Sequence, residues 1–437
     1  MFAITGMIGS GKSFVSSVIR EAGFDVLDAD ALVHELYKEN AQLRKKIAEE
    51  FGSEALNENG INRAYISSLV FSNPQKLGIL ESFVYPVLAE EIKRRKPDFV
   101  EAAVLYKTPE WEKKMKQIWL VDTDEHLRME RIASRNLTCL PVQRIGYHTK
   151  IIENNGTKKQ CKKKVLELLN IPSIVKKNIS LKKYTTFKIG GNAKFFAEPK
   201  KVGEICTLLA WCKEFEIPYI VLGKGSNVLF EDYNGLVIKW GTRLHDLIQD
   251  AANRGLGGLE KLDGIPGSIG GAIFMNAGAH GQQISDCIKS VTSITEDGEI
   301  KIRTKAQCEF SYRSSVFKNL HEIIFSAEFD FIHMPKETID KNRKEVQVSR
   351  RIKQPLQYPN AGSIFKNPES KSAGALIEAC GLKGYQIGDA QVSELHANFI
   401  VNKGNATAKD VKALMEKIAQ EVKRVHGIEL EKEIWIP

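Results

Sequence analysis

The chain has 437 residues, of which 43% are hydrophobic and 27% are charged, and its formal net charge is +9. This length suits two or three domains, and the composition excludes a disordered chain. A basic chain can bind nucleic acid, a membrane surface or small polyanions. No apolar run approaches the roughly 18 residues of a membrane span, and no basic stripe is interleaved with aromatic residues. We therefore expect small phosphorylated ligands, with no nucleic-acid or membrane partner.

The seven cysteines show neither CxxC pairs nor the spacing of zinc ligands. We therefore expect buried thiols in a reducing compartment. The first residues already have the pattern of a strand, so we expect no signal peptide and a cytoplasmic location. The sequence makes no prediction of the oligomeric state.

A phosphate-binding pattern, GMIGSGKS, occupies residues 6–13. The apolar run 2–5 before it predicts a strand, and the apolar spacing over 13–21 predicts a helix. Strand, glycine loop and helix together are the context of a P-loop, which binds a triphosphate with backbone amides and the helix N-terminus. We expect Lys12 to reach the phosphates of ATP and Ser13 to ligate Mg²⁺. The residues expected to contact this nucleotide are Gly6, Gly9, Ser10, Gly11, Lys12 and Ser13.

A second apolar run, FDVLDAD, contains the acids Asp28 and Asp30 at its end. We expect both to end the second strand, at the carboxyl edge of an open α/β sheet, where ligands bind. One of these carboxylates can accept a proton from an attacking hydroxyl. A solvated strand end without a catalytic role is the alternative for each.

These segments, together with FGSEAL, VDTDEHLRMERIASRN and a final NNGT, resemble dephospho-CoA kinase over about residues 1–170. The resemblance implies an α/β P-loop kinase domain, with a parallel sheet and flanking helices, over residues 1–172. It implies phosphorylation of the ribose 3′-hydroxyl of dephospho-CoA by Mg·ATP. It assigns Asp30 as the general base, and Arg131 or Arg135 to the transferring phosphate.

The chain departs from this kinase family at three places. Tyr85-Pro86 stands where the family commonly has His-Pro, EAAVLYK at 101–107 replaces an Asp-x-Pro-Leu-Leu-x-Glu pattern, and the segment between Arg135 and Asn154 is shorter than usual. A shorter lid excludes water less well and supplies fewer phosphate contacts. A nucleotide-binding module without kinase activity is therefore the alternative for this half of the chain.

Two glycine-rich loops, VLGKGSNVLF and GIPGSIGGAIFMNAGA, follow in the second half. Before them, TFKIGG and AKFFAEP predict two strands around a glycine turn, 202–215 predicts a helix and 217–222 predicts a further strand. Glycines allow close approach to a pyrophosphate and leave room for a bulky flat ligand, so the loops indicate a flavin site. The residues expected to contact this cofactor are Gly223, Lys224, Gly225, Ser226, Asn227, Gly264, Ile265, Pro266, Gly267, Gly270, Gly271, Asn276 and Ala277.

Further motifs are FSYRSSVFK, QPLQYPNAGSIFKNP, AGALIEACGLKGYQIGDAQVSELHANFIVN and GIELEKEIW. With the two loops they resemble UDP-N-acetylenolpyruvoylglucosamine reductase over about residues 175–437. The resemblance implies reduction of UDP-N-acetylglucosamine enolpyruvate to UDP-N-acetylmuramate, a cell-wall precursor, with FAD and NADPH. It implies an α+β FAD-binding domain of the vanillyl-alcohol-oxidase type at 173–345 and a small α+β substrate domain at 346–437.

This reaction delivers a hydride to one carbon and builds negative charge on the next. A cation and a hydrogen-bond donor stabilise that enediolate, and an acid protonates the carbon. The resemblance assigns Arg313 and Glu433 to the intermediate, Ser363 to the proton and Asn367 to the substrate. Lys366 is expected to tune Ser363 and to lie at the substrate.

Two points about this set stay open in the sequence. Glu429 and Glu431 lie close to Glu433, so only the register of the segment selects Glu433. About 50 residues separate Arg313 from Ser363, which leaves no room for the insert of the long form of the family. We therefore expect the short form, in which another element closes over the UDP group.

The whole chain is thus expected to be a bifunctional enzyme. The alternatives are a reductase joined to a non-catalytic nucleotide-binding module, and a flavin oxidase acting on another substrate. The set Arg313, Ser363 and Glu433 argues against an oxidase, which needs no proton donor to an enediolate carbon.

Overall fold

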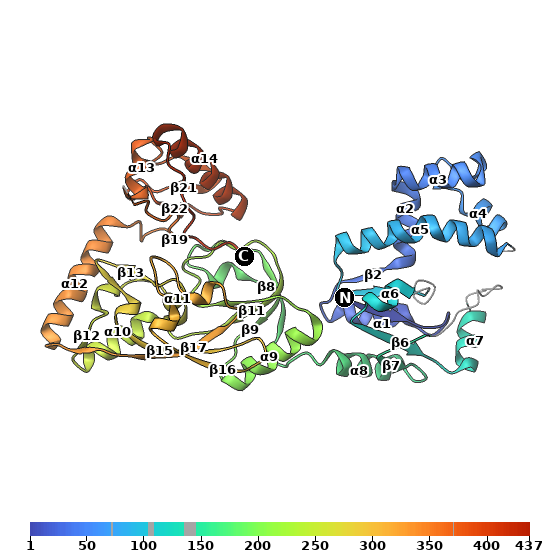
Figure 1. Ribbon diagram of the computed structural model, residues 1–437, viewed down its shortest axis with the longest axis horizontal. Helices are drawn as coiled ribbons and strands as arrows, with labels where there is room; N and C mark the ends of the chain where they lie inside the picture. Colours follow the sequence, from blue (N-terminus) through green and yellow to red (C-terminus); the bar gives the residue numbers. More distant parts are fainter. Residues whose placement is uncertain (71–72, 104–108, 135–145, 370) are drawn as a thin grey trace. The chain divides into compact units, whose positions relative to one another are not determined.

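The computed structural model describes residues 1–437 except 71–72, 104–108, 135–145 and 370. Over these residues the chain forms two compact units, Met1–Ile171 and Pro172–Pro437 (Figure 1). The division lies next to the boundary expected near residue 172. No helix in the described ranges combines the length and the hydrophobicity that crossing a bilayer requires.

The first unit is built on a parallel sheet with the strand order β2-β5-β1-β6-β7. Its strands are β1 (Phe2–Thr5), β2 (Val26–Asp28), β5 (Phe99–Glu101), β6 (Gln117–Asp122) and β7 (Lys150–Glu153). Apolar side chains fill the layer between sheet and helices, where the ring centroids of Phe99 and Trp119 are 5.1 Å apart. Parallel strands are covered on both faces, and this explains why their sequences are short continuous apolar runs.

Helices surround this sheet. They are α1 (Lys12–Glu21), α2 (Ala29–Glu39), α3 (Ala41–Phe51), α4 (Arg63–Val70), α5 (Pro74–Arg95), α6 (Pro109–Lys114), α7 (Glu125–Ala133) and α8 (Lys158–Leu169). Helices α2 to α5 group together around one apolar core, next to the small hairpin of β3 (Leu56–Asn57) and β4 (Gly60–Ile61) (Figure 1). The predicted first strand is confirmed, and the predicted helix after it begins at Lys12.

The expectation that both acids end the second strand is wrong for Asp30. Strand β2 stops at Asp28, because the Asp28 carboxylate accepts the backbone N–H groups of Asp30 and Ala31 and caps α2. Asp30 therefore lies in the first turn of that helix.

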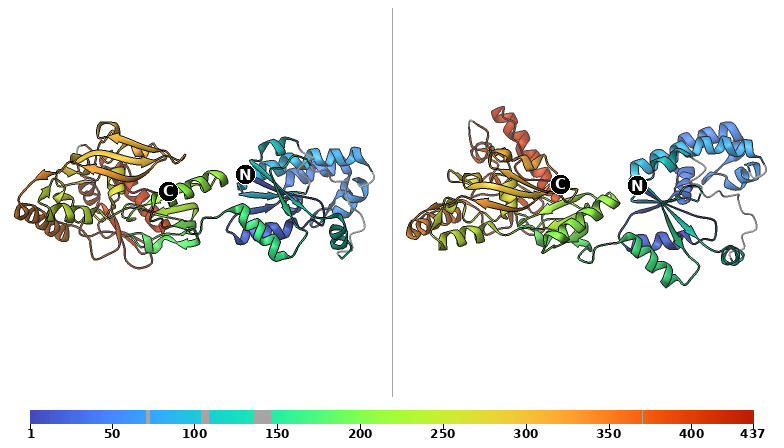
Figure 2. Two further views of the ribbon diagram at one scale, coloured as in Figure 1. Left: turned by 90° about the horizontal axis from the view of Figure 1, so that it is seen from below. Right: turned by 60° about the horizontal axis from the view of Figure 1, so that its bottom comes forward.

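The second unit contains a sheet of order β10-β11-β9-β8 and a sheet of order β16-β15-β17, which Figure 2 shows in green and in yellow to orange. The strands are β8 (Lys176–Ser180), β9 (Asn192–Ala197), β10 (Tyr219–Leu222), β11 (Tyr233–Lys239), β15 (Ile288–Ile294), β16 (Ile300–Thr304) and β17 (Ile323–Phe329). Short strand pairs join β12 (Leu256–Gly257) to β18 (Ile332–His333) and β13 (Gly278–Ala279) to β14 (Gln282–Gln283). The helices are α9 (Val202–Phe215), α10 (Leu244–Asn253), α11 (Ile269–Phe274) and α12 (Lys336–Lys353).

One strand expectation in this unit is wrong. The strand that pairs with β9 is β8, whereas TFKIGG forms no strand. Lys188 in this segment adopts a φ of 57°, in the left-handed region, which interrupts an extended backbone. The predicted helix over 202–215 is confirmed as α9.

The C-terminal part of this unit is a sheet of order β19-β22-β21-β20 covered by two helices. Its elements are β19 (Asn360–Ser363), α13 (Ala373–Ala379), β20 (Gln386–Ile387), β21 (Ala390–Val392), β22 (Phe399–Asn402) and α14 (Ala408–His426). Phe187 and Leu229, from the earlier part of the unit, are buried in the same core. Helix α12 is continuous through residues 345 and 346, so the expected boundary between FAD-binding and substrate domains lies inside a helix.

Candidate active sites

The P-loop connects β1 to α1 and is fixed in shape by polar side chains from elsewhere in the unit. Gly11 adopts a φ of 97°, in the left-handed region, where a side chain is unfavourable. A Cβ on Gly11 would also lie 2.3 Å from Asn154 Nδ2. Both Asn154 Nδ2 (2.7 Å) and Thr123 Oγ1 (2.9 Å) donate to the Ser10 carbonyl oxygen. The protein thus sets the loop conformation itself, which lowers the cost of binding an anion.

Lys12 and Ser13 both contact groups that border the loop. Lys12 Nζ donates to the carbonyl oxygens of Gly6 (2.9 Å) and Met7 (3.2 Å). Ser13 Oγ donates to Glu101 Oε1 (3.0 Å). Glu101 ends β5 and is 7% exposed. No sequence motif points to it, although it begins the unusual EAAVLYK segment.

This donor set fits the nucleotide that the sequence predicts. A hydroxyl and a carboxylate side by side offer the oxygen ligands that Mg²⁺ prefers when phosphates complete its shell. The Ser10 hydroxyl is buried and finds no hydrogen-bond partner among the described residues. A buried hydroxyl without a partner in an anion-binding loop fits a phosphate oxygen.

The positive charge of Lys12 acts electrostatically on the Asp30 carboxyl. Burial and the neighbouring Asp28 raise the pKa of the Asp30 carboxyl, whereas Lys12 and His34 lower it. Protein atoms crowd around the Asp30 carboxyl and raise its pKa, although the residue as a whole is exposed to solvent. The charge of Lys12, the expected phosphate ligand, therefore acts on Asp30, the expected base.

Arg131 braces the P-loop from α7. Its guanidinium donates to the carbonyl oxygens of Asn154 (3.0 Å) and Ser10 (3.4 Å). Carbonyl oxygens around a guanidinium satisfy it without a phosphate, so Arg131 supports the loop in this structure. Arg135, the other arginine expected at the phosphate, lies outside the described residues, as does the part of EAAVLYK at 104–107.

The two glycine-rich loops of the second unit meet at Gly223 and Ser268. A Cβ on Gly223 would lie 2.0 Å from Ser268 Oγ, which caps α11. Next to this contact, a cavity of about 260 Å³ is lined by residues 240–242, the start of α11 and part of β17. Glycines at 241 and 270 keep two positions of its wall free of side chains, and most of the rest is apolar or aromatic, from Trp240, Ile269 and β17. A cavity lined mostly by apolar residues beside two touching loops fits a flat cofactor such as FAD.

Two asparagines expected at the cofactor each donate a hydrogen bond to a backbone carbonyl of the protein. Asn227 Nδ2 donates to the Glu433 carbonyl oxygen (3.0 Å), and Asn276 Nδ2 donates to the Ser311 carbonyl oxygen (2.9 Å). Asn276 is 1% exposed. Each of these bonds uses one N–H of a primary amide, which leaves a second N–H and the amide oxygen for another partner. The contact of Asn227 with a pyrophosphate therefore stays a prediction, and in this structure both asparagines fix the loops to the catalytic segments.

Arg313 and Glu433 form an ion pair in a partly buried position. Arg313 Nε donates to Glu433 Oε1 at 2.8 Å, and the two side chains are 21% and 15% exposed. Glu429 pairs with Lys423 and Glu431 pairs with Lys366, so among these three acids it is Glu433 that faces Arg313. The structure thus answers the question of register that the sequence left open.

Burial raises the pKa of Glu433, and Arg313, Lys366 and Lys318 act against that shift. The guanidinium also lies beside the second glycine-rich loop, because a Cβ on Gly278 would stand 3.4 Å from Arg313 Nη1. The charge pair is therefore placed next to the loop that is expected to hold the flavin.

Ser363 ends β19, next to the segment that carries Glu433. The Glu433 backbone N–H donates to the Ile364 carbonyl oxygen (2.8 Å), which joins the two segments. Lys366, expected to tune Ser363, pairs with Glu431 of the C-terminal segment in this structure. Its effect on Ser363 stays a prediction. Asn367 Oδ1 accepts the Ala373 N–H (3.0 Å) at the start of α13.

Comparisons with known proteins agree with this geometry. Sequence models described as "UDP-N-acetylenolpyruvoylglucosamine reductase, C-terminal domain" and "FAD binding domain" match residues 354–436 and 236–303. The reductase of that name from Lactobacillus delbrueckii subsp. bulgaricus is 42% identical over 281 residues, which cover 60% of this chain and 95% of the relative. The chain belongs to the UDP-N-acetylenolpyruvoylglucosamine reductase family.

Two further relatives support the assignment. The reductase from Protochlamydia amoebophila is 42% identical over 289 residues, covering 62% of this chain and 96% of the relative. The crystal structure of the reductase from Thermus caldophilus matches with a TM-score of 0.52 and 35% identity, over 60% of this chain and 98% of that chain. The resemblance stated for the second half of the chain is confirmed.

The N-terminal unit has a separate family match. A sequence model described as "Dephospho-CoA kinase" matches residues 1–178. The resemblance stated for the first half is therefore also confirmed, and so is the predicted fold class of a parallel-sheet kinase domain followed by an FAD-binding domain. The chain is a fusion of a dephospho-CoA kinase unit and a reductase unit.

Proposed function

We propose that the second unit reduces UDP-N-acetylglucosamine enolpyruvate to UDP-N-acetylmuramate, and that the first unit phosphorylates dephospho-CoA. The observation that carries the first activity is the Arg313–Glu433 pair beside the glycine-rich loop at Gly278. The observation that carries the second is the Ser13–Glu101 pair at the P-loop, where the charge of Lys12 also acts on Asp30.

In the reductase, the glycine-rich loops around Gly223 and Gly270 would hold FAD, which would supply the hydride chemistry between NADPH and the terminal carbon of the enolpyruvyl double bond. The negative charge that develops on the substrate spreads to its carboxylate, where the Arg313 guanidinium stabilises it. Glu433 orients that guanidinium through the 2.8 Å bond. Ser363 donates a proton to the carbon next to the hydride acceptor, and water restores the serine hydroxyl.

In the kinase, Mg²⁺ when bound neutralises charge on the phosphates of ATP. Lys12 leaves the carbonyl oxygens of Gly6 and Met7 and contacts the phosphates, while Ser13 and Glu101 hold the metal side of the site. Asp30 accepts the proton of the ribose hydroxyl as that oxygen attacks the terminal phosphate.

The reductase proposal is tested by NADPH oxidation that depends on the enolpyruvyl substrate. Arg313→Met should lower kcat by about a thousandfold, which is the size of effect seen when a group that stabilises an oxyanion is removed. The matched control is Arg254→Met, because Arg254 forms an exposed ion pair with Asp250 in the same unit. NADPH oxidation at the same rate without the enolpyruvyl substrate would instead point to an oxidase.

The kinase proposal is tested by ADP release from Mg·ATP with and without dephospho-CoA. Release should depend on dephospho-CoA and disappear in Lys12→Ala, while the reductase rate of the same preparation stays unchanged. ATP binding without turnover would contradict the proposal and identify the unit as a nucleotide-binding module.

A further inference from the structure

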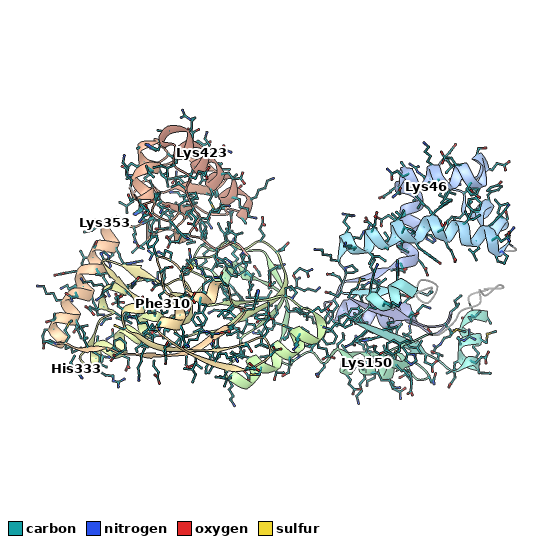
Figure 3. The ribbon with its side chains drawn as sticks, in the orientation of Figure 1. Lys46, Lys150, Phe310, His333, Lys353 and Lys423 are labelled. Atoms are coloured by element: carbon teal, nitrogen blue, oxygen red, sulfur yellow. The ribbon has the colours of Figure 1, made fainter. Side chains whose placement is uncertain are left out.

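The Arg313 side chain is carried by an unusual backbone. Arg313 has a φ of 55°, in the left-handed region that residues other than glycine rarely adopt. It lies in a tight turn in which Ser311 and Ser314 exchange two backbone hydrogen bonds of 3.1 Å. Figure 3 labels Phe310, which leads into this turn. Such a conformation persists only where surrounding groups hold it.

Both ends of the turn are tied to the segment around α11. Asn276 Nδ2 donates to the Ser311 carbonyl oxygen at 2.9 Å, and Ser315 Oγ donates to the Phe274 carbonyl oxygen at 2.8 Å. Ser315 is 3% exposed and Asn276 is 1% exposed. These two anchors hold the turn beside the glycine-rich loop at Ser311 and Ser315, on either side of Arg313.

Lys318 makes the contact at the centre of the turn. Its Nζ donates to the Arg313 carbonyl oxygen at 2.7 Å. The groups whose charge reaches this ammonium are Lys366, Glu431 and Glu433. Burial and Lys366 lower the pKa of Lys318, while the two glutamates raise it. A lysine in this crowded position, bonded to a main-chain carbonyl, restrains the backbone at the residue whose side chain meets Glu433.

We propose that Lys318 is a positioning residue for the reductase reaction, which holds the Arg313 backbone in its left-handed conformation and so aims the guanidinium at Glu433 and the substrate. The proposal rests on the proposed reductase function and adds a residue to it. Because Lys318 acts through Arg313, its loss should impair the step in which charge builds on the substrate, and spare the step in which NADPH reduces the flavin.

The test separates these two steps by stopped-flow absorbance on the full chain with bound flavin. In Lys318→Met, oxidation of the reduced protein by the enolpyruvyl substrate should slow at least about tenfold. Reduction by NADPH should stay within about threefold of the original rate. Lys318→Arg keeps a cationic donor and should recover most of the lost rate.

The matched control is Lys305→Met. Lys305 also donates to a main-chain carbonyl, that of Asp286 (3.3 Å), but it is exposed. Both steps should keep their rates in this variant. A Lys318→Met protein that slows both steps equally, or neither, would overturn the proposal.

A crystal structure of Lys318→Met tests the proposed effect on the Arg313 backbone independently of the reaction rates. The expected result is an Arg313 φ outside the left-handed region and a lost 2.8 Å bond to Glu433. An unchanged turn would overturn the positioning role even if the rates fell. The two proposals can fail separately. If the unaltered chain did not reduce the enolpyruvyl substrate, but the turn relaxed in Lys318→Met, the proposed function would fail. The role of Lys318 in holding the Arg313 backbone would stand.

Discussion

Gly223 lies directly against Ser268, since a Cβ on Gly223 would stand 2.0 Å from the Ser268 hydroxyl oxygen. That oxygen accepts the backbone N–H of Gly271 at the start of α11 (3.2 Å). The two glycine-rich loops, far apart in the sequence, therefore share one tight contact. Their shape as a cofactor site depends on the absence of a side chain at position 223.

Gly223→Ala should weaken FAD binding because the new methyl group forces the loops apart. Overpacking of this kind costs about 1–3 kcal/mol, which corresponds to roughly a 5- to 150-fold rise in the Kd for FAD. Titration of the flavin-free protein with FAD, followed by fluorescence, gives this value. Gly203→Ala is the control, because an added Cβ at Gly203, within α9, has no neighbouring atom within 4 Å. Equal affinity in both variants would show that the loops yield without cost.

The Arg313–Glu433 pair predicts a pH-dependent stability. Burial raises the pKa of Glu433 and Arg313 opposes that rise, so Arg313→Met raises this pKa further. A carboxyl with a raised pKa in the folded state costs stability as the pH climbs above its unfolded pKa of about 4.3. Arg313→Met should therefore destabilise the unit by about 2 kcal/mol near pH 8 and by clearly less near pH 5, both by urea unfolding.

The control for this prediction is the double variant Arg313→Met/Glu433→Gln. It has no ionisable group at position 433, so its stability deficit relative to Glu433→Gln should be the same at both pH values. A deficit of Arg313→Met that does not change with pH would mean that Glu433 stays ionised without its partner.

Much of the fold follows from local patterns in the sequence. The strand at Phe2–Thr5, the helix after the P-loop and the helix at 202–215 were predictable, because apolar periodicity and glycine placement act over a few neighbouring residues. The end of β2 was not predictable from the sequence, because an aspartate can either extend a strand or cap a helix. Only the bonds from Asp30 and Ala31 to the Asp28 carboxylate show that it caps α2.

The partners of the site residues were harder to predict because they come from distant parts of the chain. Asn227 bonds a carbonyl 206 positions away, and Arg313 bonds a carboxylate 120 positions away. Lys366 lies three residues after Ser363, yet its ammonium pairs with Glu431. Sequence motifs identify which residues matter, whereas the direction of each side chain depends on how the segments pack.

Glu101 should contribute to Mg²⁺ binding in the kinase unit, because its carboxylate accepts the Ser13 hydroxyl at 3.0 Å. Glu101→Gln keeps the size of the side chain and an acceptor but removes the charge. The Mg²⁺ concentration that gives half-maximal ADP release should rise by about 10- to 100-fold, the usual cost of losing a group that supports a metal ligand. Glu125→Gln, on exposed α7, should leave it unchanged. An unchanged Mg²⁺ dependence in Glu101→Gln would assign Glu101 a purely structural role.

Asp28 should set the lower pH limit of the kinase reaction through Asp30. Burial is the largest cause that raises the pKa of Asp30, and the negative charge of Asp28 is the next. A general base works only when deprotonated, so the rate falls as the pH drops through its pKa. Asp28→Asn removes the charge and keeps an oxygen that can cap α2.

The acid limb of kcat/KM for dephospho-CoA should therefore move to lower pH in Asp28→Asn, because one nearby negative charge is lost. Asp25→Asn is the matched control, because Asp25 is not among the groups that shift the pKa of Asp30, and its acid limb should not move. A shift of the limb to higher pH, or the same profile in all three proteins, would show that Asp30 is not the group whose protonation limits the rate.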